Sequence, residues 1–84
     1  MKWVMYMKFY SRLKYLRLEA RLSQADVAKV LSCSQVGYSM YELGKRKISV
    51  EKLILLSKMY HTSMDYMVGL TDEREPRSGR YRRA

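Results

Sequence analysis

Apolar side chains recur at intervals of three and four residues through most of the chain, which is the spacing of one helix face. The pattern predicts short α-helices over 11–20, 24–31, 35–43 and 50–60, and a fifth that ends by Gly69. Ser23, Ser34, Ser49 and either Thr62 or Ser63 stand where N-caps of the last four helices are expected. No segment alternates polar and apolar residues over the length of a β-strand. The sequence therefore predicts an all-α domain.

The second and third predicted helices are separated by only three residues, 32–34. So short a turn makes two helices cross steeply, as in a helix-turn-helix. A close crossing needs a small residue on the second helix, and Ala28 is suitably placed; Tyr38 and Tyr41 can anchor the third helix. At about 100° per residue, both tyrosines share one side of that helix. The opposite side presents Gln35, Val36, Ser39 and Met40. An α-helix with one presented face fits the major groove of B-DNA.

Charge and composition narrow the class of protein. The 84 residues make one small domain, and 17 Lys and Arg against 8 Asp and Glu give a net charge of +9. Such a charge favours an anionic partner, nucleic acid before acidic lipid or protein. The single cysteine, Cys33, and the single histidine, His61, are too few for a disulfide or a His/Cys metal site.

Several other function classes find no support in the sequence. No apolar run approaches the roughly 18 residues of a membrane-spanning helix, and the N-terminal segment lacks the features of a signal peptide. The chain contains no nucleophile–base constellation, phosphate-binding loop or metal-ligand set. We therefore expect a protein that is not an enzyme, has no cofactor or metal, binds no membrane and shows no small-molecule site.

Three regions differ in composition: an apolar leader at 1–8, the helical region at 9–70 and a polar tail at 71–84. The leader is expected either to pack on the domain or a second subunit, or to be a disordered end. The tail is expected to be a flexible basic arm that follows phosphates or the minor groove, or a solubilising tail. Its cationic side chains include Arg77, Arg80, Arg82 and Arg83.

An ordered set of motifs carries a family resemblance: Leu16-Arg17, then 22–28 (LSQADVA), then Ser34 to Ser39, then Tyr41-Glu42-x-Gly44-Lys45-Arg46. Over about residues 9–69 the chain resembles the phage Cro and repressor type (XRE-like) helix-turn-helix family. The resemblance implies a five-helix, lambda-repressor-like DNA-binding domain with its helix-turn-helix at about residues 24–43. It also implies a transcriptional repressor that acts as a homodimer on a near-palindromic operator. Such a protein would be cytoplasmic, nucleoid-associated and encoded by a bacterium or phage.

The resemblance implies roles for individual residues. Phosphate contacts fall on Gln24, Lys45 and Arg46, and a buried structural ion pair joins Arg17 to Glu42. Contacts to bases in double-stranded DNA fall on Gln35, Val36, Ser39 and Met40. Among these, only Gln35 has a side chain suited to bidentate contact with adenine, whereas the apolar side chains can meet thymine methyl groups. The dimer surface is expected on the fifth helix, where apolar area comes from Met64, Met67 and Leu70.

Four positions depart from the family pattern. Ser32 stands where the turn usually has glycine, and a left-handed serine costs about 1–2 kcal/mol. Tyr38 replaces an aliphatic anchor and needs a partner for its hydroxyl. Gly37 costs about 1 kcal/mol relative to alanine inside a helix. Leu43 replaces a residue that is commonly polar, so it can join Val36 and Met40 in an apolar patch. The alternative function is therefore a protein-interaction module of the same fold, antitoxin-like or a regulator-partner subunit, with weak or no DNA binding.

Overall fold

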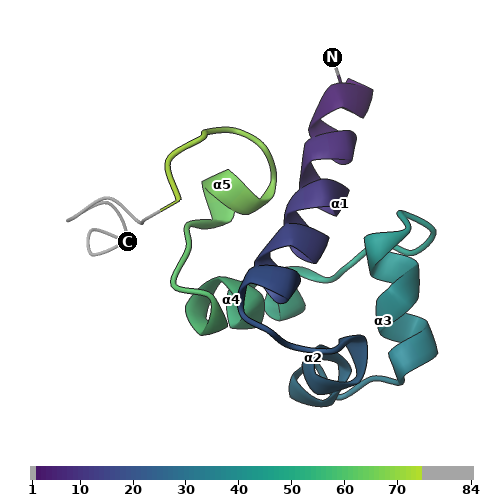
Figure 1. Ribbon diagram of the computed structural model, residues 1–84. Coiled ribbons are helices and arrows are strands. Elements are labelled where there is room, and N and C mark those ends of the chain that lie inside the picture. The colour runs from purple at the N-terminus through teal and green to yellow at the C-terminus, as the bar shows by residue number, and fades with distance from the viewer. Residues whose placement is uncertain (1, 75–84) are drawn as a thin grey trace.

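The computed structural model describes the backbone of residues 2–74 and the side chains of residues 9–74. This part of the chain folds into helices only, as predicted (Figure 1). Their bounds are α1 Lys2–Glu19, α2 Gln24–Val30, α3 Gln35–Glu42, α4 Val50–Met59 and α5 Met64–Met67. The helices α2, α3 and α4 lie within one residue of the expected bounds at each end. None of the described helices is long and apolar enough to cross a membrane.

Serine side chains begin the last four helices. Ser23, Ser34, Ser49 and Ser63 each accept a hydrogen bond from the backbone N–H three residues later. At α2 the exchange is mutual, because Asp26 N–H donates to Ser23 Oγ over 3.0 Å and Ser23 N–H donates to the Asp26 carboxylate over 2.9 Å. This reciprocal pair is a capping box. The local N-terminal signals in the sequence therefore placed these helix starts correctly, with Ser63 as the cap of α5.

Each helix in the described part of the chain ends on a left-handed residue. Gly44 and Gly69 do so at little steric cost, whereas the other three ends use Arg21, Ser32 and His61, with φ of 60°, 56° and 53°. At each end two successive N–H groups bond back to the last helical turn. At the end of α2, for example, Cys33 N–H donates to the Ala28 carbonyl over 2.9 Å and Ser32 N–H to the Lys29 carbonyl over 3.2 Å. This is the Schellman arrangement, and it satisfies carbonyls that the helix leaves unpaired.

Helix α1 is much longer than predicted. The expected start was Ser11, but the helix begins at Lys2. No glycine or proline interrupts residues 2–10, and lysine and methionine favour helices, so nothing in the backbone stops α1 from extending. Residues 2–8 of the expected leader therefore continue a domain helix. Their side chains, and hence any packing of Trp3 to Tyr6, lie outside the described residues.

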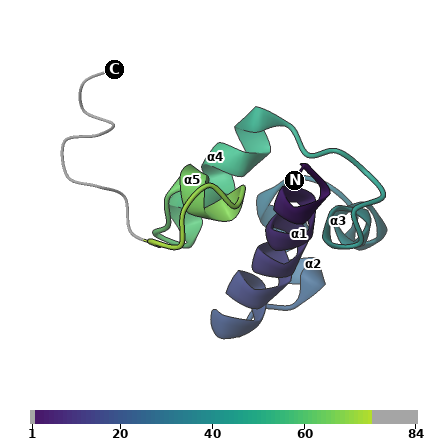
Figure 2. The ribbon, with the colours of Figure 1, turned by 90° about the horizontal axis from the view of Figure 1, so that it is seen from above.

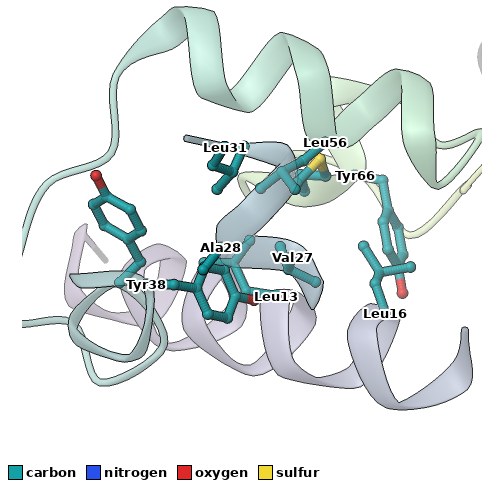
Figure 3. Packing of buried hydrophobic residues seen from close by; sticks show 10 residues of the cluster. Leu13, Leu16, Val27, Ala28, Leu31, Tyr38, Leu56 and Tyr66 are labelled. Carbon is teal, nitrogen blue, oxygen red and sulfur yellow. The ribbon is translucent and has the colours of Figure 1, made fainter. Parts of the chain in front are cut away.

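Helix α1 is the central element of the fold. Figure 2 shows α3 on one side of α1, and α4 and α5 on the other. The core takes side chains from every helix, and Figure 3 shows them gathered in one cluster. Its fully or almost fully buried members include Leu13, Leu16, Val27, Ala28, Leu31, Tyr38, Leu56 and Met67. This cluster holds α2 and α3 at a fixed position against α1.

The segment after α5 differs from the expected flexible tail. Arg12 of α1 donates to the Thr71 carbonyl over 2.7 Å and pairs with the Asp72 carboxylate at 2.6 Å. The Arg74 carbonyl accepts from Ser63 N–H over 2.7 Å. Residues 71–74 therefore pack on the domain, because these bonds link them to α1 and to the start of α5. The remainder of the predicted arm, including Arg77, Arg80, Arg82 and Arg83, lies outside the described residues.

The expected dimer patch also needs correction. Met67 is fully buried in the core, so it offers no apolar area to a second subunit. It points inward because α5 has a single turn and its core contact falls on Tyr66 and Met67. Leu70, in contrast, has 63% of its surface exposed, and Met64 is half-buried.

Candidate nucleic-acid interface

Helix α3 has one packed and one presented face, as its sequence pattern predicts. Tyr38 is fully buried and Tyr41 almost so. On the opposite side Gln35 is exposed and Val36 has 71% of its surface exposed. Met40 and Ser39 are half-buried at the edges of that face. The four residues expected to contact bases thus lie together on the outer side of one helix, with none of them in the core.

An ion pair attaches α3 to α1. Arg17 Nε lies 2.6 Å from Glu42 Oε2, and Arg17 Nη2 donates to Oε1 over 3.2 Å. The remaining Arg17 terminal nitrogen donates to the Leu22 carbonyl over 3.0 Å. Both side chains are largely buried, with 10% and 5% of their surfaces exposed. The pair that the resemblance implies is therefore present, and its bidentate geometry fixes the end of α3 relative to α1.

Two further donors complete the surroundings of the Glu42 carboxylate. The Tyr38 hydroxyl donates to Oε2 over 2.6 Å, which supplies the partner that the sequence left unassigned. Gln24, at the start of α2, donates from Nε2 to Oε1 over 3.2 Å. This residue, which is expected to contact phosphate, therefore also belongs to the hydrogen-bond network around Glu42. Each carboxylate oxygen accepts two hydrogen bonds, and three helices meet at one residue.

The surroundings of Glu42 favour its charged form. Burial alone would raise the pKa of Glu42, but hydrogen bonds from Arg17, Tyr38 and Gln24, with the Arg17 charge, lower it below its usual value. The pKa of Tyr38 is raised by burial and by the adjacent carboxylate. Burial also raises the pKa of Tyr60 to about 12, and no residue in the described part of the chain hydrogen-bonds its buried hydroxyl. At neutral pH the network is therefore a carboxylate–guanidinium pair with neutral tyrosines.

The loop after α3 carries three exposed cations, Lys45, Arg46 and Lys47. Among the described residues, no carboxylate pairs with any of them. The loop begins at Gly44, where φ is +75° and the Tyr10 ring of α1 lies only 2.5 Å from the point that a Cβ would occupy. Both the backbone conformation and this close approach require glycine. The loop that carries the cations expected to bind phosphate thus begins at a glycine that packs against α1.

Two contacts near the interface were not predicted. The first is the packing of Tyr10 on Gly44, and the second places Arg46 Nη1 only 3.1 Å from the point where a Cβ of Gly37 would lie. The sequence gives a weak signal for each, since a glycine stands at an α-helix end and another inside a helix. Neither signal identifies the side chain that fills the space.

The described residues hold no group of three or more His, Cys, Asp or Glu side chains that could bind a metal ion. Cys33 is a free, half-buried thiol in the turn between α2 and α3. What the region does provide is a firmly anchored helix with an exposed outer face and adjacent positive charge.

The fold and this arrangement define a helix-turn-helix protein. The sequence profile of the helix-turn-helix family matches residues 13–67, and the chain belongs to this family, in its XRE-like, lambda-repressor-like branch. Among solved structures, the chain is similar to that described as "Crystal structure of transcriptional regulator from Listeria innocua". The TM-score is 0.71 and the identity 28%, over 89% of this chain and 68% of that one.

Two relatives from Bacillus subtilis (strain 168) are similar in sequence. The HTH-type transcriptional regulator YobD, described as uncharacterized, is 32% identical over 69 residues, which are 82% of this chain and 62% of the relative. The HTH-type transcriptional regulator YqaE, also described as uncharacterized, is 33% identical over 60 residues, 71% of this chain and 52% of the relative. The chain thus spans between about half and two thirds of the length of these relatives.

Proposed function

We propose that this chain binds double-stranded DNA as a transcriptional regulator, with α3 lying in the major groove. The observation that carries the proposal is the division of α3 into a buried face and an outer face whose Val36 is 71% exposed. The Arg17–Glu42 pair holds the helix rigidly, and it is followed by three cations that pair with no described carboxylate. The similarity to proteins named as HTH-type transcriptional regulators supports the same function.

The side chains suggest how bases and phosphates are contacted. Gln35 pairs with an adenine edge, whereas Val36 and Met40 make apolar contacts, as with thymine methyl groups. The Ser39 hydroxyl donates to the Val36 carbonyl over 2.7 Å, so toward DNA it offers an acceptor. Lys45 and Arg46 bind phosphates beside the groove, together with Gln24 and the free N–H groups at the start of α2. Because Gln35 is the single side chain among the four presented residues suited to bidentate contact with a base, much of the affinity for DNA comes from the phosphate contacts.

We further propose that two copies form a two-fold dimer and act as a repressor. Each subunit then contacts one half of a near-palindromic operator, with the half-sites about one helical turn apart. The exposed side chain of Leu70 and the half-buried Met64 supply apolar area at α5 for the contact between subunits. Occupation of a promoter would block transcription, in the cytoplasm of a bacterium.

A salt titration tests DNA binding. Fluorescence anisotropy would follow binding of the chain to a labelled duplex of about 20 base pairs, long enough for two half-sites. We expect the logarithm of the affinity to fall linearly with the logarithm of salt concentration, with a slope of about −0.9 for each phosphate neutralised. Selection from random duplexes would then identify the operator. Absence of binding at low salt would refute the proposal.

One alternative function has a specific observation in its favour. Val36 and Leu43 are 71% and 64% exposed, and with Met40 they lie at helical spacing along the outer side of α3 and its end. Apolar area of this kind also suits a protein partner. A protein-interaction module of the same fold would bind its partner with little dependence on salt, because apolar burial is not screened by ions. The same titration therefore separates the two functions.

A further inference from the structure

Gly37 occupies a position inside a helix, where glycine is destabilising. It lies in the interior of α3, and after proline glycine is the residue that disfavours a helix most. Its φ is not in the left-handed region, so the backbone conformation does not require it. Gly37 is nevertheless buried. The reason for a glycine must therefore lie in what covers it.

Two side-chain ends cover Gly37. A Cβ built on this residue would lie 3.1 Å from Arg46 Nη1 and 3.1 Å from Ser34 Oγ. Apart from its two chain neighbours and the backbone of α3 itself, no other described atom lies within 4 Å of that point. The missing Cβ therefore makes room for two polar groups, one of which is the head of an otherwise exposed arginine.

The position of Gly37 on the helix makes this contact relevant to the interface. At roughly 100° per residue, Gly37 is about 60° from Met40 and about 40° from Tyr41, at the border between the outer and the packed face. The Arg46 guanidinium thus lies along the edge of the face that enters the groove. No described carboxylate pairs with it there, so its charge remains available.

We propose that Gly37 is a positioning residue for Arg46. By lacking a Cβ, it lets the guanidinium rest against α3 at the edge of its outer face, where it binds one phosphate of the DNA backbone. This inference rests on the proposed DNA binding. Even an alanine Cβ at position 37 requires the guanidinium to move by a few tenths of an ångström, which weakens that phosphate contact without changing the fold of α3.

A double-mutant cycle tests this coupling. Binding to a random-sequence duplex would be measured across a range of salt concentrations for the original chain, Gly37→Ala, Arg46→Ala and the double variant. A random sequence suffices because phosphate contacts do not depend on base identity. We expect Arg46→Ala to weaken binding about tenfold, the effect of one charge-assisted hydrogen bond, and to reduce the salt slope by about 1. Gly37→Ala only shifts the guanidinium, so it should weaken binding by a smaller factor. The double variant should bind no more weakly than Arg46→Ala alone.

Lys45→Ala provides the matched control. This substitution also removes a neighbouring cation, but Lys45 is not one of the groups that cover Gly37. In a chain that carries both substitutions, the fold-loss of affinity should therefore equal the product of the losses caused by Lys45→Ala and Gly37→Ala alone. Thermal unfolding of each variant gives a second readout, since alanine at 37 should leave the midpoint unchanged or raise it.

The outcomes separate this inference from the proposed function. If the original chain fails to bind duplex DNA at low salt, both are overturned. If it binds, but the losses from Gly37→Ala and Arg46→Ala multiply, only the positioning role is refuted. An unchanged affinity in Gly37→Ala refutes it as well. A loss of affinity accompanied by a lowered unfolding midpoint also refutes it, because the substitution would then have disturbed the fold.

Discussion

At the scale of single residues, Glu42 is the group on which the interface depends most. Its two oxygens accept hydrogen bonds from Arg17, Tyr38 and Gln24, which belong to α1, α3 and α2. Burying such a carboxylate is tolerable because every neighbour is a donor. Removing its charge would leave the Arg17 guanidinium buried without a counterion, which costs more than the pair itself contributes.

We therefore expect Glu42→Gln to lower the free energy of unfolding by about 3 kcal/mol. Urea unfolding followed by circular dichroism at pH 7 would measure it. Glu51→Gln is the control, since Glu51 is exposed in the first turn of α4 and should change stability by only a few tenths of a kcal/mol. Equal losses in the two variants would contradict the role of the network.

The same carboxylate makes stability depend on pH. The pKa of Glu42 is lowered in the folded chain, so its contribution is complete above the ordinary glutamate pKa of about 4.3 and is lost as pH falls through the lowered folded value. The difference in stability between the original chain and Glu42→Gln should accordingly shrink as the pH is lowered from about 7 toward 3. A difference that stays constant would show that the charge is not what stabilises this site.

Three helices end on a left-handed residue other than glycine, and here a substitution is expected to raise the free energy of unfolding, unlike Glu42→Gln. His61 is exposed with φ of 53° and belongs to no described hydrogen bond through its side chain. His61→Gly should raise the free energy of unfolding by about 0.5–1 kcal/mol, because glycine relieves the left-handed strain but loses more chain entropy. Lys58→Gly, three residues earlier inside α4, should lower it by about 1 kcal/mol. A stabilising effect at both positions, or at neither, would contradict this explanation.

At the scale of elements, the crossing of α2 and α3 decides the geometry of the outer face. Ala28 lies at this crossing with 2% of its surface exposed. Ala28→Leu should force the helices apart and destabilise the domain by about 1–3 kcal/mol. Ala25→Leu on the exposed side of the same helix should change stability by less than about 0.5 kcal/mol. Thermal unfolding compares the two, and an unchanged midpoint in Ala28→Leu would refute the close crossing.

A substitution on the outer face of α3 should change the specificity of DNA binding rather than the affinity for DNA in general. Gln35→Ala should weaken binding to a selected operator by about 1–3 kcal/mol and leave binding to random duplexes nearly unchanged. Competition experiments with both duplexes at fixed salt measure the ratio. The matched substitution Lys45→Ala should weaken both duplexes equally, because it removes a phosphate contact. An equal loss on both duplexes in Gln35→Ala would exclude its contact with a base.

At the scale of the whole molecule, the proposed dimer makes Leu70 the most informative position. With Met67 buried, the apolar area available beside α5 depends on this residue, which is 63% exposed. Leu70→Glu should convert a dimer to monomers in sedimentation velocity, because it places a charge in an apolar contact. Leu18→Glu, at a residue 55% exposed on α1, is the control and should leave the dimer intact. A chain that sediments as a monomer without any substitution would contradict the dimer.

Much of the fold could be predicted because its determinants are local. Ser23, Ser34, Ser49 and Ser63 cap helices through bonds to residues three positions away, so the signal lies within one turn of chain. Helical periodicity likewise assigned Tyr38 to the core and Val36 to the outer face. The predicted start of α1 at Ser11 was wrong, since the apolar spacing behind that prediction does not show how far the helix extends toward the N-terminus.

Local signals in the sequence thus specify α2, α3 and α4, the turn between α2 and α3 and the presented side of α3, since these follow from backbone propensity, capping and side-chain spacing. Tertiary packing, in contrast, places Tyr38 and Gln24 on Glu42, Arg46 over Gly37 and residues 71–74 on α1. Each of these contacts joins groups from different turns or helices, and periodicity does not specify how far helices slide or rotate against one another. That placement follows from packing the whole core at once.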